Sequence, residues 1–238
     1  MEFSDVLWAT IPILILEYIA AIAGIFFLKN SSNYTNWDKY FVWYLWLTCF
    51  VETIGLYSPL AYYTDYAYFS FVRDTSFISN YWLYNAFTLV SISFYCLYFI
   101  SYLKSINKRK VLTALIFVYM IYSIGHLLMS GVFFKGYSQV ILFSGVLLLI
   151  INVIFYYFEL LRSDQIMNVK YLLPIYVSVG ALLFYICVTP ILFLSNYFST
   201  ENSLFVNLRI NVMLYANIFL YSTYTFGFLI CSKKRKYF

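Results

Sequence analysis

Residues 138–161 read SQVILFSGVLLLIINVIFYYFELL, and this stretch decides the fold. From Ser138 to Phe158 it contains no charged residue. An α-helix rises about 1.5 Å per residue, so a run of this length crosses the bilayer core, which takes about 20 residues. The stretch therefore predicts a membrane-spanning helix.

Six further apolar runs of similar length lie on either side of it. The seven runs cover Leu7–Leu28, Tyr40–Tyr62, Tyr81–Leu103, Val111–Phe134, Ser138–Leu161, Tyr171–Tyr197 and Leu208–Cys231. The connections are short, and the longest, residues 63–80, is aromatic and is expected to hold a short helix on the membrane surface. We predict an all-α, polytopic membrane protein: a single seven-transmembrane-helix bundle over residues 1–238, with no soluble domain.

The composition excludes most other classes of protein. Hydrophobic residues make up 63% of the 238 residues. Charged residues make up only 11%, whereas soluble domains carry about 25%. This composition excludes a cytosolic enzyme, a nucleic-acid-binding domain, a disordered chain and a disulfide-stapled secreted domain. The aromatic content partly reflects AT-rich codons, so no aromatic residue is assigned to a site on abundance alone.

The distribution of Lys and Arg predicts the orientation. Twelve of the fifteen fall on one side of the predicted spans, namely Lys29, Lys39, Lys104, Lys108, Arg109, Lys110, Arg162, Lys170 and residues 233–236. The other side holds Arg73, Lys135 and Arg209. Cytoplasmic loops carry the excess of positive charge, so the N-terminus is expected outside and the C-terminus in the cytoplasm of a bacterial inner membrane. The basic tail is then expected to face anionic membrane lipid rather than nucleic acid.

Six polar residues within the predicted spans are candidates for a ligand- or proton-binding site. They are Glu17, Glu52, Asn85, His126, Asn152 and Asn217. Polar and ionisable groups inside a membrane are costly, and ionisable groups there are functional candidates by default. From the helical rise, both glutamates fall near the middle of the membrane, with His126 at a similar depth.

The most specific prediction concerns the two glutamates. The first two spans are joined by a short connection, so they are expected to be antiparallel neighbours. Glu17 shares a face with Ala20 and Gly24, and Glu52 shares one with Thr48, Gly55 and Pro59. Small residues allow close helix packing. We expect one shared site in which the two carboxyl groups share a proton, hold a cation or pair with His126.

Simpler interpretations of the same residues remain open. Each Asn, Ser, Thr or Tyr in a span is more often a hydrogen-bond partner of a neighbouring helix than a ligand contact. Each glutamate would then hydrogen-bond Tyr or Asn separately as a neutral acid. The four cysteines, Cys49, Cys96, Cys187 and Cys231, lie in different spans and are expected to pack as small apolar residues. No catalytic residue, metal site or cofactor is predicted.

Two resemblances bear on the family. Seven spans and about 240 residues resemble the plan of a microbial rhodopsin, but Thr223 occupies the position of the Schiff-base lysine, which excludes covalently bound retinal. The segments Glu52-Thr53-Ile54-Gly55, Trp82-Leu83-Tyr84-Asn85 and Tyr224-Thr225-Phe226-Gly227-Phe228 resemble small uncharacterised seven-helix bacterial membrane proteins related to sensor modules. No functional residue is carried over from either group.

Four functions compete at this stage. The first is a non-enzymatic sensor or receptor that binds a small ligand, lipid or proton and signals to a separate cytoplasmic protein. The second is a proton- or cation-coupled transporter or channel that uses Glu17 and Glu52. The third is an intramembrane lipid enzyme with His126 and a glutamate as acid and base. The fourth is a membrane effector of bacterial defence.

Overall fold

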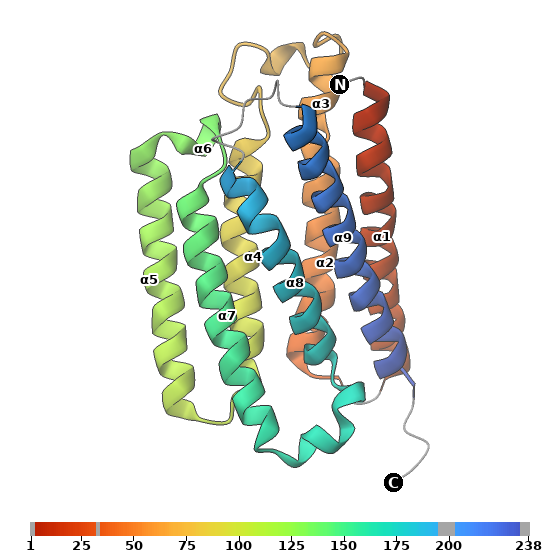
Figure 1. Ribbon diagram of the computed structural model, residues 1–238, viewed down its shortest axis with the longest axis vertical. Coiled ribbons are helices and arrows are strands. Elements are labelled where there is room, and N and C mark those ends of the chain that lie inside the picture. Colours follow the sequence, from red (N-terminus) through yellow and green to blue (C-terminus); the bar gives the residue numbers. More distant parts are fainter. Residues whose placement is uncertain (1–2, 32–33, 195–202, 234–238) are drawn as a thin grey trace. The chain divides into compact units, whose positions relative to one another are not determined.

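The computed structural model of the chain describes residues 3–31, 34–194 and 203–233 (Figure 1). Within these ranges the chain forms nine α-helices, two 3-10 helices and no strand. They are α1 (Phe3–Asn30), α2 (Asn36–Gly55), α3 (Tyr57–Tyr63), η1 (Ser70–Val72), α4 (Tyr81–Ser101), α5 (Ile106–Ser130), α6 (Val132–Lys135), α7 (Gln139–Leu161), η2 (Asp164–Tyr171), α8 (Leu173–Leu194) and α9 (Ser203–Cys231). The all-α prediction is confirmed.

Seven segments of the described chain are long and apolar enough to cross a membrane. They are Thr10–Asn30, Asn36–Tyr63, Tyr81–Ser101, Ile106–Ser130, Gln139–Leu161, Leu173–Leu194 and Leu204–Cys231. Each overlaps one of the seven predicted runs, which confirms the runs as helices. The last residues of the sixth predicted run, 195–197, and the basic residues 234–236 lie outside the described residues.

The fourth predicted run differs from the structure at its end. We expected one helix to Phe134, but α5 ends at Ser130 and a separate short helix, α6, follows. Gly131 between them has a φ of +66°. Glycine enters this left-handed region without a side-chain clash and commonly ends helices in this way.

The second predicted run is broken between α2 and α3. The break lies four residues before Pro59, which has no backbone N–H to donate to the carbonyl of Gly55. Asn80 donates its side-chain amide to that carbonyl oxygen at 2.9 Å. An asparagine from the following loop therefore supplies the donor that the proline lacks.

The chain divides into two compact units. Unit 1 comprises residues 1–49 and 153–238, and unit 2 comprises residues 50–152. The boundaries fall within α2 and α7. Both units are helical, and the single transmembrane domain expected from the sequence stays a prediction.

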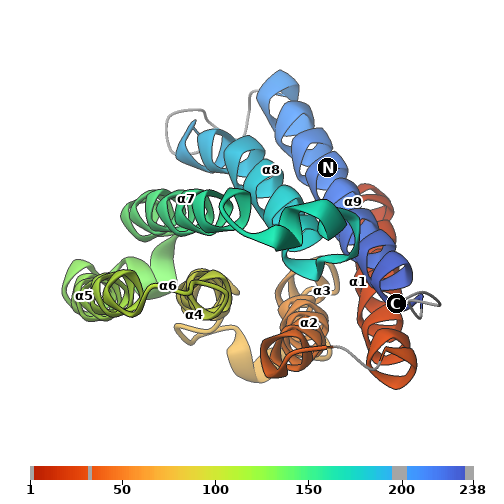
Figure 2. The same ribbon diagram turned by 90° about the horizontal axis from the view of Figure 1, so that it is seen from below.

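In unit 1, α9 packs against both α8 and α1 (Figures 1 and 2). Glycines allow these helices to approach closely. A Cβ added to Gly227 on α9 would lie 2.6 Å from Cβ of Tyr176 on α8, and one added to Gly180 on α8 would lie 2.8 Å from the ring of Tyr224. Tyr224 in turn stands edge-on to Phe41 of α2, with ring centroids 5.1 Å apart.

In unit 2, α4 packs against α5, and α6 contacts both (Figure 2). A third helix joins them through Gly145 on α7. A Cβ on Gly145 would clash with Ile92 of α4 and would lie 2.6 Å from the hydroxyl of Tyr119 on α5. That hydroxyl donates to the carbonyl oxygen of Ile141 on α7 at 3.2 Å.

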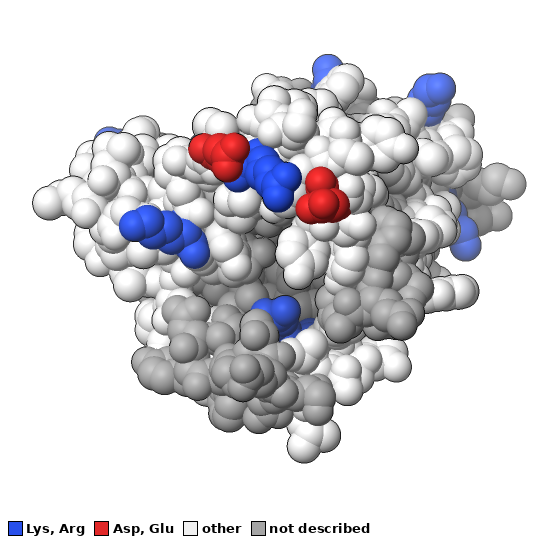
Figure 3. Space-filling model, turned by 90° about the horizontal axis from the view of Figure 1, so that it is seen from above, with Lys and Arg blue, Asp and Glu red and all other residues white. Residues whose placement is uncertain are grey.

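The segment between α3 and α4 contains one short 3-10 helix, η1, where a surface helix was expected. Near the start of this segment, Asp65 and Tyr66 have positive φ angles of 46° and 60°. The guanidinium of Arg73 lies 5.6 Å from the ring centroid of Tyr66, within the range of a cation–π contact. Seen from above, the molecule shows scattered charged side chains on a mostly uncharged surface (Figure 3).

Gly227→Ala is expected to destabilise the protein. Its new methyl group would meet Cβ and Cγ of Tyr176, which lie too close to the backbone of α8 to move freely. Overpacking of this kind costs about 1–3 kcal/mol. The matched control is Gly125→Ala on α5, where no atom lies within 4 Å of the added Cβ. Thermal unfolding in detergent should show a lower Tm for Gly227→Ala only; equal Tm values for both variants would contradict the described α8–α9 packing.

Candidate functional site

The six predicted site residues fall in both units. Glu17 on α1 and Asn217 on α9 belong to unit 1. Glu52, Asn85, His126 and Asn152 belong to unit 2, on α2, α4, α5 and α7. Each residue is described below within its own unit. The shared site expected for Glu17 and Glu52 stays a prediction.

Glu17 lies in the interior of the protein, with 2% of its surface exposed. The small residues on the same face of α1 are buried too, and Ala20 is fully enclosed. A Cβ on Gly24, two turns further along, would lie 2.8 Å from Val42 of α2 and 3.3 Å from Phe228 of α9. The small-residue face of α1 therefore packs against α2 and α9, within unit 1.

Glu52 is half-buried and pairs with a tyrosine of α4. The hydroxyl of Tyr84 donates to Oε2 of Glu52 at 2.8 Å. Gly55 lies one turn from Glu52, and a Cβ there would lie 2.5 Å from the hydroxyl oxygen of Tyr84. The missing side chain at Gly55 therefore leaves the room that Tyr84 needs to reach the carboxyl group.

An aromatic network fixes the start of α4 to α3. The hydroxyl of Tyr57 accepts a hydrogen bond from Nε1 of Trp82 at 3.0 Å. The same hydroxyl donates to the carbonyl oxygen of Phe77 at 2.7 Å and to that of Ser79 at 2.8 Å. This network holds the loop before α4 in place and thereby positions Tyr84 one turn into the helix.

Asn85 ties α4 to the turn between α6 and α7. Its side-chain amide donates to the carbonyl oxygens of Phe133 at 3.1 Å and Gly136 at 2.8 Å. Its carbonyl oxygen accepts from the backbone N–H of Ser138 at 3.0 Å. Only 4% of Asn85 is exposed. Three backbone groups at a helix end are thus satisfied by one side chain, which is a structural role.

His126 has a different environment from the other candidates. Its ring stacks on Tyr122 of the same helix, with centroids 6.3 Å apart and an interplanar angle of 18°. His126 is half-buried, and Tyr122 is 52% exposed. The stacking partner of the histidine is therefore a residue on the outer face of α5.

Asn152 belongs to a group of buried polar residues in unit 2. We use the name inner polar cluster for these four buried residues of three helices: Ser91 and Ser93, which face different sides of α4, Ser123 on α5 and Asn152 on α7. Each is at most 7% exposed, and both Ser123 and Asn152 are fully buried. The hydroxyls of Ser91 and Ser93 and Oδ1 of Asn152 have no hydrogen-bond partner in the described part of the chain, whereas the hydroxyl of Ser123 faces that of Tyr119 one turn away.

The helices that carry the inner polar cluster meet at Gly145. Ile92, which contacts Gly145, lies between the two serines of α4. Ser123 lies one turn from Tyr119, the other residue that contacts Gly145. Asn152 lies two turns from Gly145 on the same face of α7. A buried hydroxyl or amide without a partner costs roughly 1–3 kcal/mol, so the cluster is costly for the fold.

Asn217 in unit 1 makes a local interaction. Its amide donates to the carbonyl oxygen of Met213 on the same helix at 2.8 Å. Asn152 makes the same kind of bond, to Leu148 at 2.8 Å. In residues 3–31, 34–194 and 203–233, no group of three or more His, Cys, Asp or Glu side chains is placed to hold a metal ion.

Sequence reasoning missed the partners that give these residues their environment. Tyr84 was noted only as part of the Trp82–Asn85 segment, although it is the partner of Glu52. Asn80 and Tyr57, which bond to Gly55 and Trp82, lie outside the polar positions that the sequence marks as candidates. The position of Pro59 is the signal that points to Asn80, because it predicts an unpaired carbonyl at Gly55.

No protein-family model, curated protein or solved structure matches this chain. The resemblance to seven-helix bacterial sensor modules therefore stays a prediction.

Asn85→Ala is expected to lower stability strongly, because it leaves two carbonyl oxygens and one N–H of the α6–α7 turn unpaired. Each buried unpaired group costs about 1–3 kcal/mol. Thr88→Ala is the matched control, since the hydroxyl of Thr88 donates only to Tyr84 within the same helix, at 2.8 Å. Thermal unfolding compares the two variants. Equal losses of stability would contradict the clamping role of Asn85.

A double-mutant cycle tests the Glu52–Tyr84 hydrogen bond. Glu52→Ala, Tyr84→Phe and the double variant are unfolded by denaturant in mixed micelles. A hydrogen bond contributes about 0.5–1.5 kcal/mol between neutral groups and about 1.5–3 kcal/mol to a charged group, and we expect a coupling energy of at least about 0.5 kcal/mol. Gly55→Ala should weaken the same coupling, because its methyl group displaces Tyr84. Additive effects of the two single substitutions would contradict the pairing.

Proposed function

We propose that this protein is a non-enzymatic membrane sensor or receptor that binds a small polar ligand at the inner polar cluster of unit 2. The observation that supports the proposal is the burial of Ser91, Ser93 and Asn152 with polar atoms that have no partner among the described residues, near the buried hydroxyl-bearing Ser123 of α5. A ligand with hydrogen-bonding groups would offset the cost of burying these atoms.

The proposal extends to orientation and partners. The N-terminus lies outside and the C-terminus lies in the cytoplasm of a bacterial inner membrane, as the excess of Lys and Arg on one side favours. The connections between the described helices are short, and the longest lies between α3 and α4. A separate cytoplasmic protein therefore receives the signal.

Proton- or cation-coupled transport is a second candidate. It is favoured by the half-buried carboxyl group of Glu52, whose Tyr84 partner can stabilise or release a charge as an ion passes. The two functions differ in what they move. A transporter carries ions across sealed vesicles, whereas a sensor binds its ligand without net flux.

The sensor proposal predicts ligand-induced stabilisation. Purified protein in lipid nanodiscs is unfolded by heat with a panel of amino acids, sugars, nucleosides, quaternary amines and lipids. A ligand at 100 times its Kd stabilises the folded state by about 2.7 kcal/mol. We expect at least one class to raise the Tm, and we expect Asn152→Leu to abolish that rise.

The matched control is Asn217→Leu, which removes a buried asparagine of α9 that bonds within its own helix. It should leave the ligand-induced shift intact. A panel in which no compound raises the Tm, or a shift that persists in Asn152→Leu, would contradict binding at the inner polar cluster.

A further inference from the structure

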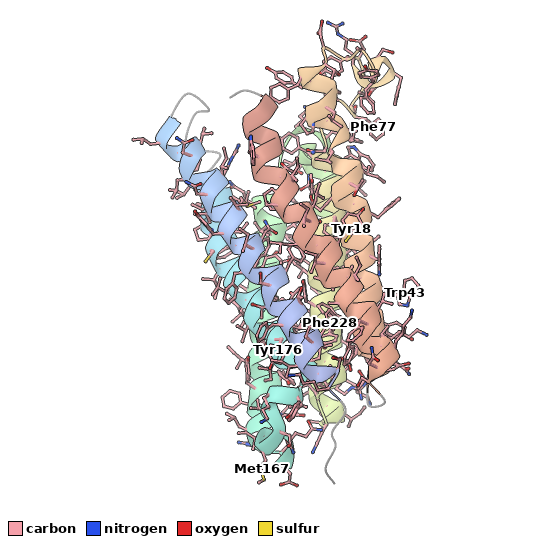
Figure 4. The ribbon with its side chains drawn as sticks, turned by 90° about the vertical axis from the view of Figure 1, so that its right-hand side faces the viewer. Tyr18, Trp43, Phe77, Met167, Tyr176 and Phe228 are labelled. Atoms are coloured by element: carbon pink, nitrogen blue, oxygen red, sulfur yellow. The ribbon has the colours of Figure 1, made fainter. Side chains whose placement is uncertain are left out.

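A groove of about 800 Å³ lies in unit 1 where α1 and α9 end side by side. Its size is within the roughly 300–1,000 Å³ range of ligand-binding sites. Phe228, labelled near this end of α9 in Figure 4, packs against Phe27 of α1 with ring centroids 5.6 Å apart. The two helices therefore run in the same direction here, and the groove follows their last turns.

The wall of the groove is apolar along its length. Phe26 of α1 and Phe226, Leu229 and Ile230 of α9 line it. Phe26 is 51% exposed and Phe226 is 65% exposed. In a membrane-spanning segment, such residues contact lipid chains. The wall is thus suited to one acyl chain lying along α9.

One end of the groove is polar and positively charged. Asn30, Ser232 and Lys233 line it there. Lys233 is exposed and has no ion pair among the residues that the structure describes. The nearest acidic residue along α2, Asp38, is buried and accepts hydrogen bonds from the backbone and hydroxyl of Thr35 at 2.8 and 2.9 Å. The carboxyl group of Asp38 is therefore held by Thr35.

Two lysines stand where α1 and α9 end. Two helix C-termini carry about half a negative charge each. Near them stand Lys29 in the last turn of α1 and Lys233 just after the last turn of α9. The exposed ammonium of Lys233 can therefore meet an anion at the end of a groove whose wall is apolar.

We propose that this groove binds one anionic glycerophospholipid, with an acyl chain on Phe26, Phe226, Leu229 and Ile230. Its phosphate contacts Lys233 and the polar groups of Asn30 and Ser232. An anionic lipid combines the two chemistries that the groove offers, whereas a second copy of this chain would bring the same positive charge to the interface. The proposal is independent of the inner polar cluster.

Native mass spectrometry tests the proposed lipid site. The full-length protein is released from micelles that contain equal amounts of phosphatidylglycerol and phosphatidylcholine. We expect one retained phosphatidylglycerol and little phosphatidylcholine. A basic residue at a membrane surface contributes about 1 kcal/mol toward anionic lipid, which corresponds to about a fivefold change in binding. Lys233→Ala should therefore weaken retention about fivefold, and Leu229→Trp, which fills the groove, should reduce it further.

Two controls separate this site from general charge attraction. Lys135→Ala removes an exposed lysine from α6 and should not change retention. Replacing residues 234–236 with alanine should weaken retention less than Leu229→Trp does. The proposal is overturned by equal retention of both lipids, by retention that depends on residues 234–236 but not on Lys233, or by a dimer that Leu229→Trp dissociates while lipid binding is unchanged.

Discussion

The need to satisfy every backbone polar group inside a membrane governs this structure. Hydrocarbon offers no hydrogen bonds, so a helix that breaks must find partners for its freed groups within the protein. The chain breaks twice near predicted span ends, after Gly55 and after Ser130. At the first break the partner is the side chain of Asn80, and the turn between α6 and α7, which follows the second break, is held by the side chain of Asn85. The remaining features of unit 2 follow from these two anchors.

The bonds of Asn80 and Asn85 fix the position of α4, and α4 in turn contacts α5, α6 and α7. Once the start of α4 is fixed by Asn80 and the Tyr57–Trp82 network, Tyr84 meets Glu52 over the space that Gly55 leaves. Further along α4, Ile92 meets Gly145 and Tyr119. The buried serines and Asn152 then lie in the interior around this junction. They contribute no hydrogen bond between helices, which distinguishes them from Asn85.

Hydropathy was sufficient to predict the seven helices, because a span is a property of consecutive residues. The environment of the candidate residues depends on contacts between distant segments. Asn85 bonds to groups 48 to 53 residues away, and Tyr84 is 32 residues from Glu52. With 27 tyrosines in the chain, nothing in the sequence singles out Tyr84. Asn85 is buried and bonds to backbone groups of the α6–α7 turn, and the ligand contact expected for it stays a prediction.

The central claim is that the inner polar cluster serves binding and is costly for the fold. The most direct measurement is the free energy of unfolding of Ser91→Ala, Ser93→Ala and Asn152→Leu combined, without ligand. Removing polar atoms that have no partner is predicted to leave this free energy unchanged or to raise it, because buried unpaired groups destabilise and apolar replacements of similar shape do not. A loss of several kcal/mol would contradict the claim and assign these residues to the fold instead.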